Sequence, residues 1–123
     1  MCKVYYLDTA MQIVKDKISL QELKIMARNT FGHLVKAVVD VEKEIMAVDG
    51  ELHADEETLL LQQGCQQKNL WGINFYPEIK GDDWLEFDSM INLRPSENNF
   101  TRGIDNSQLK KRLTQIVNRL VEK

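Results

Sequence analysis

The stretch Trp84–Arg94, with the sequence WLEFDSMINLR, decides the expected fold, because its residues sort by parity as the side chains of a strand do. One set of alternate positions is mostly apolar and consists of Leu85, Phe87, Ser89, Ile91 and Leu93. The other set is mostly polar and consists of Trp84, Glu86, Asp88, Met90, Asn92 and Arg94. We therefore predict a long strand with one face in the core. Its polar face is either solvated or the floor of a binding site.

The neighbouring segments predict two hairpins. The alternating run Leu70–Tyr76 precedes Trp84–Arg94 and is separated from it by a polar loop, so the two segments are expected to pair. Upstream, the β-branched run Leu34–Val41 and the run Ile45–Val48 form the second hairpin, before Asp49 and Gly50 turn the chain. Gln12–Val14 is a candidate fifth strand.

Helices are predicted between and after these hairpins. Ser19 and Glu22 have the spacing of a capping box and begin a helix that ends at Gly32. Three acids, residues 55–57, crowd the first turn of a second helix that Gly64 ends. Asp105 is expected to open the last helix, whose apolar stripe continues to Val121.

The order helix, hairpin, helix, hairpin, helix predicts an α+β two-layer sandwich. Its sheet would be mostly antiparallel, with about four strands in two hairpins, and three helices would cover one face. The chain has 123 residues, which suits a single domain over residues 11–123, with residues 1–10 as a peripheral extension.

Composition excludes several classes of protein. The apolar runs are too short to span a membrane, and the N-terminus lacks the basic and apolar regions of a secretory signal. Cys2 and Cys65 do not make a disulfide framework and have no metal-ligand spacing. These features predict a reduced, cytoplasmic protein.

Charge is unevenly distributed along the chain. Residues 40–57 hold eight acids against Lys43, whereas residues 110–123 hold five basic residues against Glu122. The basic helix could contact nucleic acid or the acidic region of a second copy in a homodimer. The alternative is a solvated helix face whose cations complement the helix dipole, and the acidic balance of the whole chain (net charge −3) favours it over nucleic-acid binding.

Two groups of side chains could carry catalysis. His53 lies among acids at the start of the second helix, where it could act as a base or share a metal, although a neighbour of a helix cap is the simpler interpretation. Glu86 and Asp88 are two residues apart on the polar strand face, about 7 Å from one another, which is close enough to share a cation. Asn92, Arg94 and Asn74 would extend this row, which could also be a solvated surface.

The loop that follows could bind an anion. It runs from Arg94 to Gly103, has Arg94 and Arg102 near its two ends, and leads to the start of a helix, where free backbone N–H groups favour negative charge. Asp105 would repel an anion there, and Pro95, Asn98 and Gly103 are also ordinary loop residues.

Three peptides of this chain, GELHADEETLLLQQG, LWGINFYP and WLEFDSMINLRPSENNFTRG, resemble a family of short bacterial and archaeal proteins catalogued only as a domain of unknown function. The resemblance runs from about Met11 to the C-terminus. It implies that the recurrent residues of the family include Glu51, His53, Asp55, Asp88, Asn92, Arg94, Arg102 and Gly103. It implies no reaction, cofactor or partner, and Phe100 and Thr101 depart from the small polar residues expected there.

Two classes of function follow from these candidates. The first is a binding module that recognises an anionic, phosphate-bearing ligand through Asn74, Asn92, Arg94 and Arg102, or else a protein partner. The second is a small metal-assisted hydrolase or phosphoesterase in which His53, Glu86 and Asp88 hold a metal or act as a base. No nucleophile elbow, phosphate-binding glycine loop or dinucleotide fingerprint points to a particular reaction, so binding is favoured.

Overall fold

A five-stranded antiparallel sheet organises the protein, in a computed structural model that describes residues 10–123. The strand order is β1-β4-β3-β5-β6. The strands are β1 (Gln12–Val14), β3 (Val35–Asp40), β4 (Ile45–Val48), β5 (Leu70–Phe75) and β6 (Leu85–Glu86). The α+β class, both hairpins and the candidate strand at residues 12–14 are confirmed. The predicted extension, apart from Ala10, lies outside the described residues.

Three α-helices accompany the sheet, and each begins for an identifiable reason. In α2 (Leu20–Asn29) the predicted capping box is present, because Ser19 Oγ accepts from the Glu22 amide and the Glu22 carboxylate accepts from the Ser19 amide. In α4 (Ser107–Leu120) the cap is Asn106, not Asp105 as predicted. The Asp105 carboxylate instead accepts from the Phe100 amide and so closes the preceding loop.

The helix α3 (His53–Gln62) begins without a side-chain cap, because its N-cap residue is Leu52. Glu56, one of the three acids in the first turn of this helix, is fully buried and accepts a hydrogen bond from the Gly50 amide at 2.9 Å. Gly50 is required here, since a Cβ at this position would lie 2.7 Å from Glu56 Cγ. The start of α3 is therefore fixed to the end of β4 by a buried carboxyl group.

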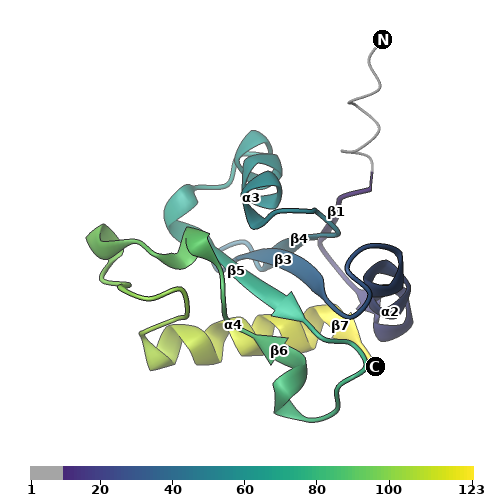
Figure 1. Cartoon of the computed structure of the whole chain (residues 1–123). Coiled ribbons are helices and arrows are strands. Elements are labelled where there is room, and N and C mark those ends of the chain that lie inside the picture. The colour runs from purple at the N-terminus through teal and green to yellow at the C-terminus, as the bar shows by residue number, and fades with distance from the viewer. Residues whose placement is uncertain (1–9) are drawn as a thin grey trace.

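The helices lie on both faces of the sheet, which differs from the expectation that all three cover one face (Figure 1). Val35, Ala37 and Val39 of β3 pack in the large core with α2 and α4, whereas Val38 packs on the other side with Leu60 of α3. The physical reason is that almost every residue of β3 and β5 is buried, whichever face its side chain lies on, so both faces of these strands must be covered.

The segment predicted as one long strand is a strand for only two residues, Leu85 and Glu86. The chain then forms the 3₁₀ turns Met90–Asn92 and Pro95–Glu97. The parity prediction was wrong beyond Glu86 because Ser89 Oγ accepts from the Ile91 amide and turns the backbone. As a result Asn92 is fully buried, whereas Leu93, assigned to the core, is 41% exposed.

A short second sheet and an ion-pair cluster join α4 to the rest of the fold. The strand β2 (Ile18–Ser19) pairs in parallel with β7 (Val121–Glu122), which follows α4 directly. Glu44, in the turn between β3 and β4, contacts Arg112 at 2.6 Å and Arg119 at 3.0 Å. Part of the charge complementarity between the acidic region and the basic helix is thus satisfied within one chain. In the described part of the chain, no helix is long and apolar enough to cross a bilayer.

Candidate functional site

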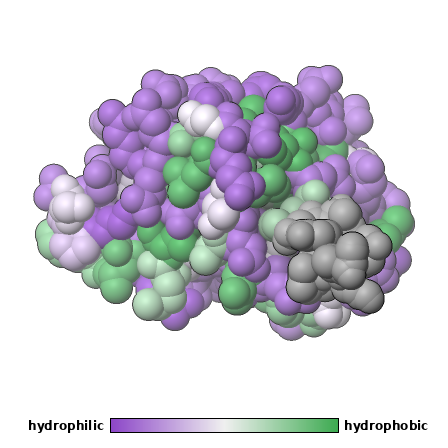
Figure 2. All heavy atoms as spheres, turned by 90° about the horizontal axis from the view of Figure 1, so that it is seen from above, coloured by the Kyte–Doolittle hydropathy of each residue, from purple (hydrophilic) through white to green (hydrophobic). Residues whose placement is uncertain are grey.

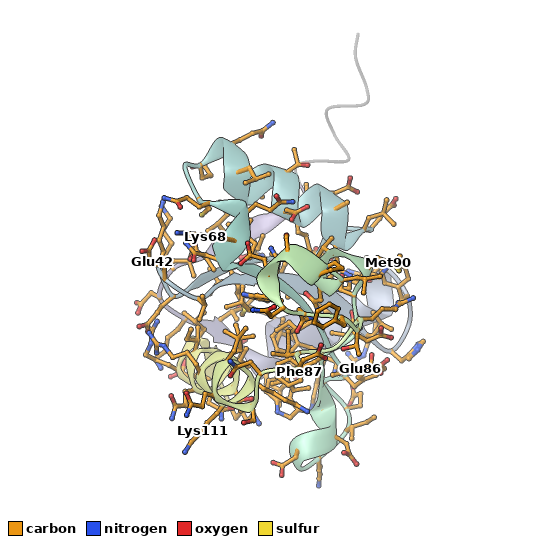
Figure 3. The ribbon with its side chains drawn as sticks, turned by 90° about the vertical axis from the view of Figure 1, so that its left-hand side faces the viewer. Glu42, Lys68, Glu86, Phe87, Met90 and Lys111 are labelled. Carbon is orange, nitrogen blue, oxygen red and sulfur yellow. The ribbon has the colours of Figure 1, made fainter. Side chains whose placement is uncertain are left out.

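A pocket of about 360 Å³ lies beside the first turn of α3, over the part of the sheet that α3 leaves uncovered. We call it the His53 pocket. Leu52 and Met90 are exposed apolar residues at its wall, and Figure 3 shows Met90 and Glu86 on the same side of the molecule. The polar residues that line it are Lys36, His53, Asn74, Tyr76, Glu86, Asp88, Ser89 and Arg102. Seen from above, this side of the protein is mostly hydrophilic with separate apolar patches (Figure 2).

The floor of the pocket is a row of polar residues from three neighbouring strands. The register places Lys36 of β3 opposite Asn74 of β5, and Asn74 opposite Glu86 of β6. Glu86 Oε1 accepts one hydrogen bond from Asn74 Nδ2 and one from the Tyr76 hydroxyl, both at 2.9 Å. Burial and the neighbouring Glu86 carboxylate raise the pKa of Tyr76, so the hydroxyl stays protonated and donates. Two neutral donors therefore hold the Glu86 carboxylate in one orientation.

His53 forms the wall of the pocket above this row. Its Nε2 lies 2.8 Å from the Ile73 carbonyl oxygen, which can only accept, so Nε2 carries the proton. Burial, more than the nearby Lys36 ammonium, lowers the pKa of His53, so the ring is neutral at pH 7 with a lone pair on Nδ1. The Ile73 carbonyl, the Asn74 side chain and the Asp88 carboxylate only partly oppose this lowering of the pKa. His53 therefore presents an acceptor, as a general base or a ligand-binding group would.

Gly72 makes room for this arrangement on β5. A Cβ at position 72 would lie 2.6 Å from both Cβ and Oγ of Ser89 and 3.3 Å from His53 Cδ2. Only a glycine therefore lets the imidazole and the 3₁₀ turn close over the strand. The sequence offered this signal as an isolated glycine within a strand, which often marks close approach of another segment.

Asp88 and Arg102 form an ion pair at the edge of the pocket. Arg102 Nε lies 2.7 Å from Asp88 Oδ1, and both side chains are about half exposed. The Asp88 backbone carbonyl also accepts from Asn74 Nδ2 at 3.1 Å. The loop cation predicted to bind an anion is thus in the pocket, but a carboxylate already neutralises it.

Asn92 and Arg94, also predicted as ligand-binding residues, lie outside the pocket lining. Asn92 bonds the amide and the carbonyl of Gly72 and the carbonyl of Arg102, which fixes the loop to β5. Arg94 donates to the carbonyls of Gln67 and Leu70 and stacks over the Trp71 ring at 4.0 Å. Burial lowers the pKa of Arg94. Arg94 and Arg102 therefore do not converge on one open surface, as the anion site requires.

The structure adds Lys36 to the candidate residues, and sequence reasoning missed it. Its ammonium lies 5.0 Å from the centre of the Phe31 ring. The parity of β3 alone places Lys36 on the same face as Val38, but only the pairing of β3 with β5 brings it beside Asn74. That pairing joins two separate hairpins, and no local sequence signal reveals it.

Two further observations bear on what the protein can bind. Among residues 10–123, no group of three or more His, Cys, Asp or Glu side chains is placed to hold a metal ion. A larger groove of about 710 Å³ lies between β6 and α4. Its lysines, Lys110 and Lys123, cover the rings of Phe87 and Trp84 at 5.2 and 4.1 Å, so those rings are shielded on that side.

Comparison with known proteins places the chain in a family. Residues 12–120 match the family described as "Protein of unknown function (DUF5674)". The chain belongs to the DUF5674 family. The match includes every residue of the His53 pocket and confirms the resemblance to a family of unknown function. No curated protein and no solved structure matches this DUF5674 protein.

Proposed function

We propose that this DUF5674 protein is a binding module and that the His53 pocket is its ligand-binding site. The main support for this proposal is that polar groups from several segments line one pocket. These segments are β3, α3, β5, β6 and the loop that contains Asp88 and Arg102. Several of these groups are oriented from beneath: Glu86 by two donors, and His53 by the Ile73 carbonyl. Preoriented side chains bind a ligand at a lower entropic cost than mobile ones.

The positions of Arg94 and Arg102 limit the classes of ligand that we expect. Arg94 donates to a backbone carbonyl outside the pocket and Arg102 pairs with Asp88, so the two arginines cannot bind one anion together. The cations that line the pocket are Lys36 and Arg102. The volume of about 360 Å³ suits a small molecule or one side chain of a protein partner. We therefore describe the ligand first as a small polar molecule.

A blocking variant tests the location of the site. Ala54 is exposed, lies in the first turn of α3 and lines the pocket, so Ala54→Trp should fill the pocket without disturbing the core. A panel of small amines, carboxylates, phosphates and amides would be screened by amide chemical-shift changes in the isotope-labelled protein. Binding to the pocket predicts shifts at residues 52–54, 72–76 and 86–90 that Ala54→Trp abolishes.

Thr58→Trp is the matched control, because Thr58 is exposed on the same helix but lies outside the pocket lining. It should keep the shifts of the unmodified protein. Shifts confined to the groove between β6 and α4, or equal losses in the two tryptophan variants, would refute the His53 pocket as the site.

A metal-assisted hydrolase is the second candidate function, because His53, Glu86 and Asp88 do line one pocket. The pairing of Asp88 with Arg102 weighs against it, as does the lack, within residues 10–123, of three His, Cys, Asp or Glu side chains placed to hold one metal ion. Calorimetric titration with Zn²⁺, Mn²⁺ and Mg²⁺ tests it directly. Stoichiometric binding that Asp88→Asn removes would favour the hydrolase over the binding module.

A further inference from the structure

We infer that the His53 pocket binds a small organic cation, with an ammonium group of the ligand placed against the Glu86 carboxylate. This inference rests on the proposed function and adds the chemical class of the ligand. It starts from an imbalance of charge inside the pocket. Asp88 is paired with Arg102, whereas Glu86 has no ion-pair partner among the described residues.

Glu86 is held in the manner of a binding group. The two hydrogen bonds from Asn74 and Tyr76 both end on Oε1, and no described residue donates to Oε2. Neutral donors orient the carboxylate without cancelling its charge. Because Glu86 is partly buried and lines the pocket, its charge is screened less than that of a fully exposed carboxylate.

The nearest competing cation of the sheet is separated from Glu86 by a full strand. Lys36 and Glu86 lie on either side of Asn74 in the register, two strand spacings or about 10 Å apart at the backbone. The Lys36 ammonium is directed over the Phe31 ring. No ion pair joins Lys36 to Glu86 within residues 10–123, so the carboxylate is open to a cation from solvent.

Asn74 supplies an independent observation. The residue is only 7% exposed, and both hydrogens of its side-chain amide have acceptors, at Glu86 and at the Asp88 carbonyl. This bonding leaves Oδ1 directed away from them, buried and without a hydrogen-bond partner among the described residues. The Asn74 side chain acts to raise the pKa of His53, so it favours positive charge beside the His53 ring and disfavours an anion at that end of the pocket.

The remaining contacts fit an amine with a short apolar chain. Neutral His53 offers Nδ1 as an acceptor and does not repel a cation. Leu52 and Met90, which are 55% and 62% exposed, give an alkyl chain apolar surface to contact. The ligand class is therefore a primary alkylammonium or a molecule that carries one, such as a lysine-like side chain.

The test compares n-butylamine with butyrate and 1-butanol, three probes with the same chain and different head groups. Each is titrated into the labelled full chain at constant ionic strength, and the amide shifts of the pocket are followed. The expected result is saturable binding of butylamine, with butyrate and butanol at least about fivefold weaker. Stronger binding of butyrate would overturn the cation assignment and leave the binding module intact, whereas no pocket shift with any probe or with the wider panel would refute both.

Glu86→Gln tests the assigned carboxylate. Glutamine keeps an oxygen that accepts from Asn74 and Tyr76, so the pocket should keep its shape while it loses the charge. Butylamine should bind at least about fivefold more weakly to this variant. Glu97→Gln, at an exposed position outside the pocket lining, makes the same charge change and should leave the affinity unaltered. Equal affinities of the two variants would overturn the inference.

The pKa of His53 gives a second test, because a bound cation and a bound anion should shift this pKa in opposite directions. A bound cation disfavours the imidazolium, so saturating butylamine should lower the pKa of His53 followed by its ring-proton shifts. A bound anion would raise this pKa. A rise on adding butylamine would contradict its placement beside Glu86 and His53.

Discussion

The two faces of the sheet differ in what is buried against them. The face toward α2 and α4 is covered by a large apolar core that includes Val39, Ile73, Phe75 and Leu113. The face toward α3 has a small apolar cluster around Val38 and Leu60, and the buried polar residues lie on this side or in the loop that packs against it. Those residues are Asp40, Glu56, Asn74, Ser89, Asn92 and Asn99.

This difference separates the large apolar core from the proposed ligand-binding pocket. Apolar burial stabilises a fold without requiring particular partners, whereas each buried polar group must have its hydrogen bonds satisfied. On the α3 face, Asn74 Oδ1 and Glu56 Oε1 remain without a partner among the described residues. Buried polar groups without partners are expected near functional sites, and one of these two residues, Asn74, lines the His53 pocket.

The largest effect is expected for a truncation on the apolar face. Phe75 is fully buried and stacks on Trp84, with ring centres 5.1 Å apart. Phe75→Ala should lower the free energy of unfolding by about 3–5 kcal/mol, as measured by urea denaturation. Phe100→Ala, at a position 63% exposed, should change it by less than about 0.5 kcal/mol. A loss below about 1 kcal/mol for Phe75→Ala would show that this face is not the main source of stability.

The next largest effect is expected for a truncation among the buried polar residues. Asn92→Ala leaves the Gly72 amide, the Gly72 carbonyl and the Arg102 carbonyl without their partner, which should cost about 2–4 kcal/mol by urea denaturation. The amide shifts of residues 86–103 should change more widely than those of α2 and α4. Asn118→Ala, on the exposed side of α4, serves as the control and should stay within about 0.5 kcal/mol. Similar free energies of unfolding for the two variants would show that the Asn92 side chain does not stabilise the fold.

The sequence predicts the apolar face well and the α3 face poorly, for physical reasons. Period-two and period-3.6 patterns report which side of an element is buried, and they located both hairpins and the helices. Such patterns carry no information on where a polar side chain finds its partner. Asn92 and Arg94 therefore looked like ligand-binding residues, whereas the structure uses them to bond the backbone of β5 and of the turn before it.

The candidate site was predicted in part. His53, Asn74, Glu86, Asp88 and Arg102 were all named from the sequence, and all line one pocket. Glu86 was on the expected face because the segment does begin as a strand. The approach of His53 to β5 depends on Gly72 and on the packing of α3 against the sheet. These contacts join distant segments and could not be read from spacing alone.

A smaller, pH-dependent effect is expected at Glu56, the buried carboxyl group of α3. Burial raises the pKa of Glu56 well above its usual range, with further upward contributions from Asp49 and Asp55, while the Gly50 amide and Lys36 oppose it. Its folded-state pKa exceeds its unfolded value, so its contribution to stability is fully present below pH 4.5 and is lost as the pH rises through the folded pKa.

Glu56→Gln should therefore be more stable than the unmodified protein at high pH and nearly equal to it near pH 4. The measurement is urea denaturation across this range. Glu57→Gln, one residue on and less buried, is the control and should show no such widening of the difference with pH. A difference that shrinks as the pH rises would mean that Glu56 is stabilised as a carboxylate.

The smallest effect is expected for Arg102, one of the two loop arginines. From the sequence, Arg94 and Arg102 were given the same role as anion-binding residues. Arg102 and Asp88 form a half-exposed pair, so Arg102→Ala should change the free energy of unfolding by less than about 1 kcal/mol, and less again at high salt. Arg94 bonds two carbonyls and stacks on Trp71, so Arg94→Ala should cost about 2 kcal/mol with little dependence on salt. Urea denaturation at low and high salt measures both. A larger loss of stability in Arg102→Ala than in Arg94→Ala would show that the Asp88–Arg102 pair stabilises the fold instead of serving the pocket.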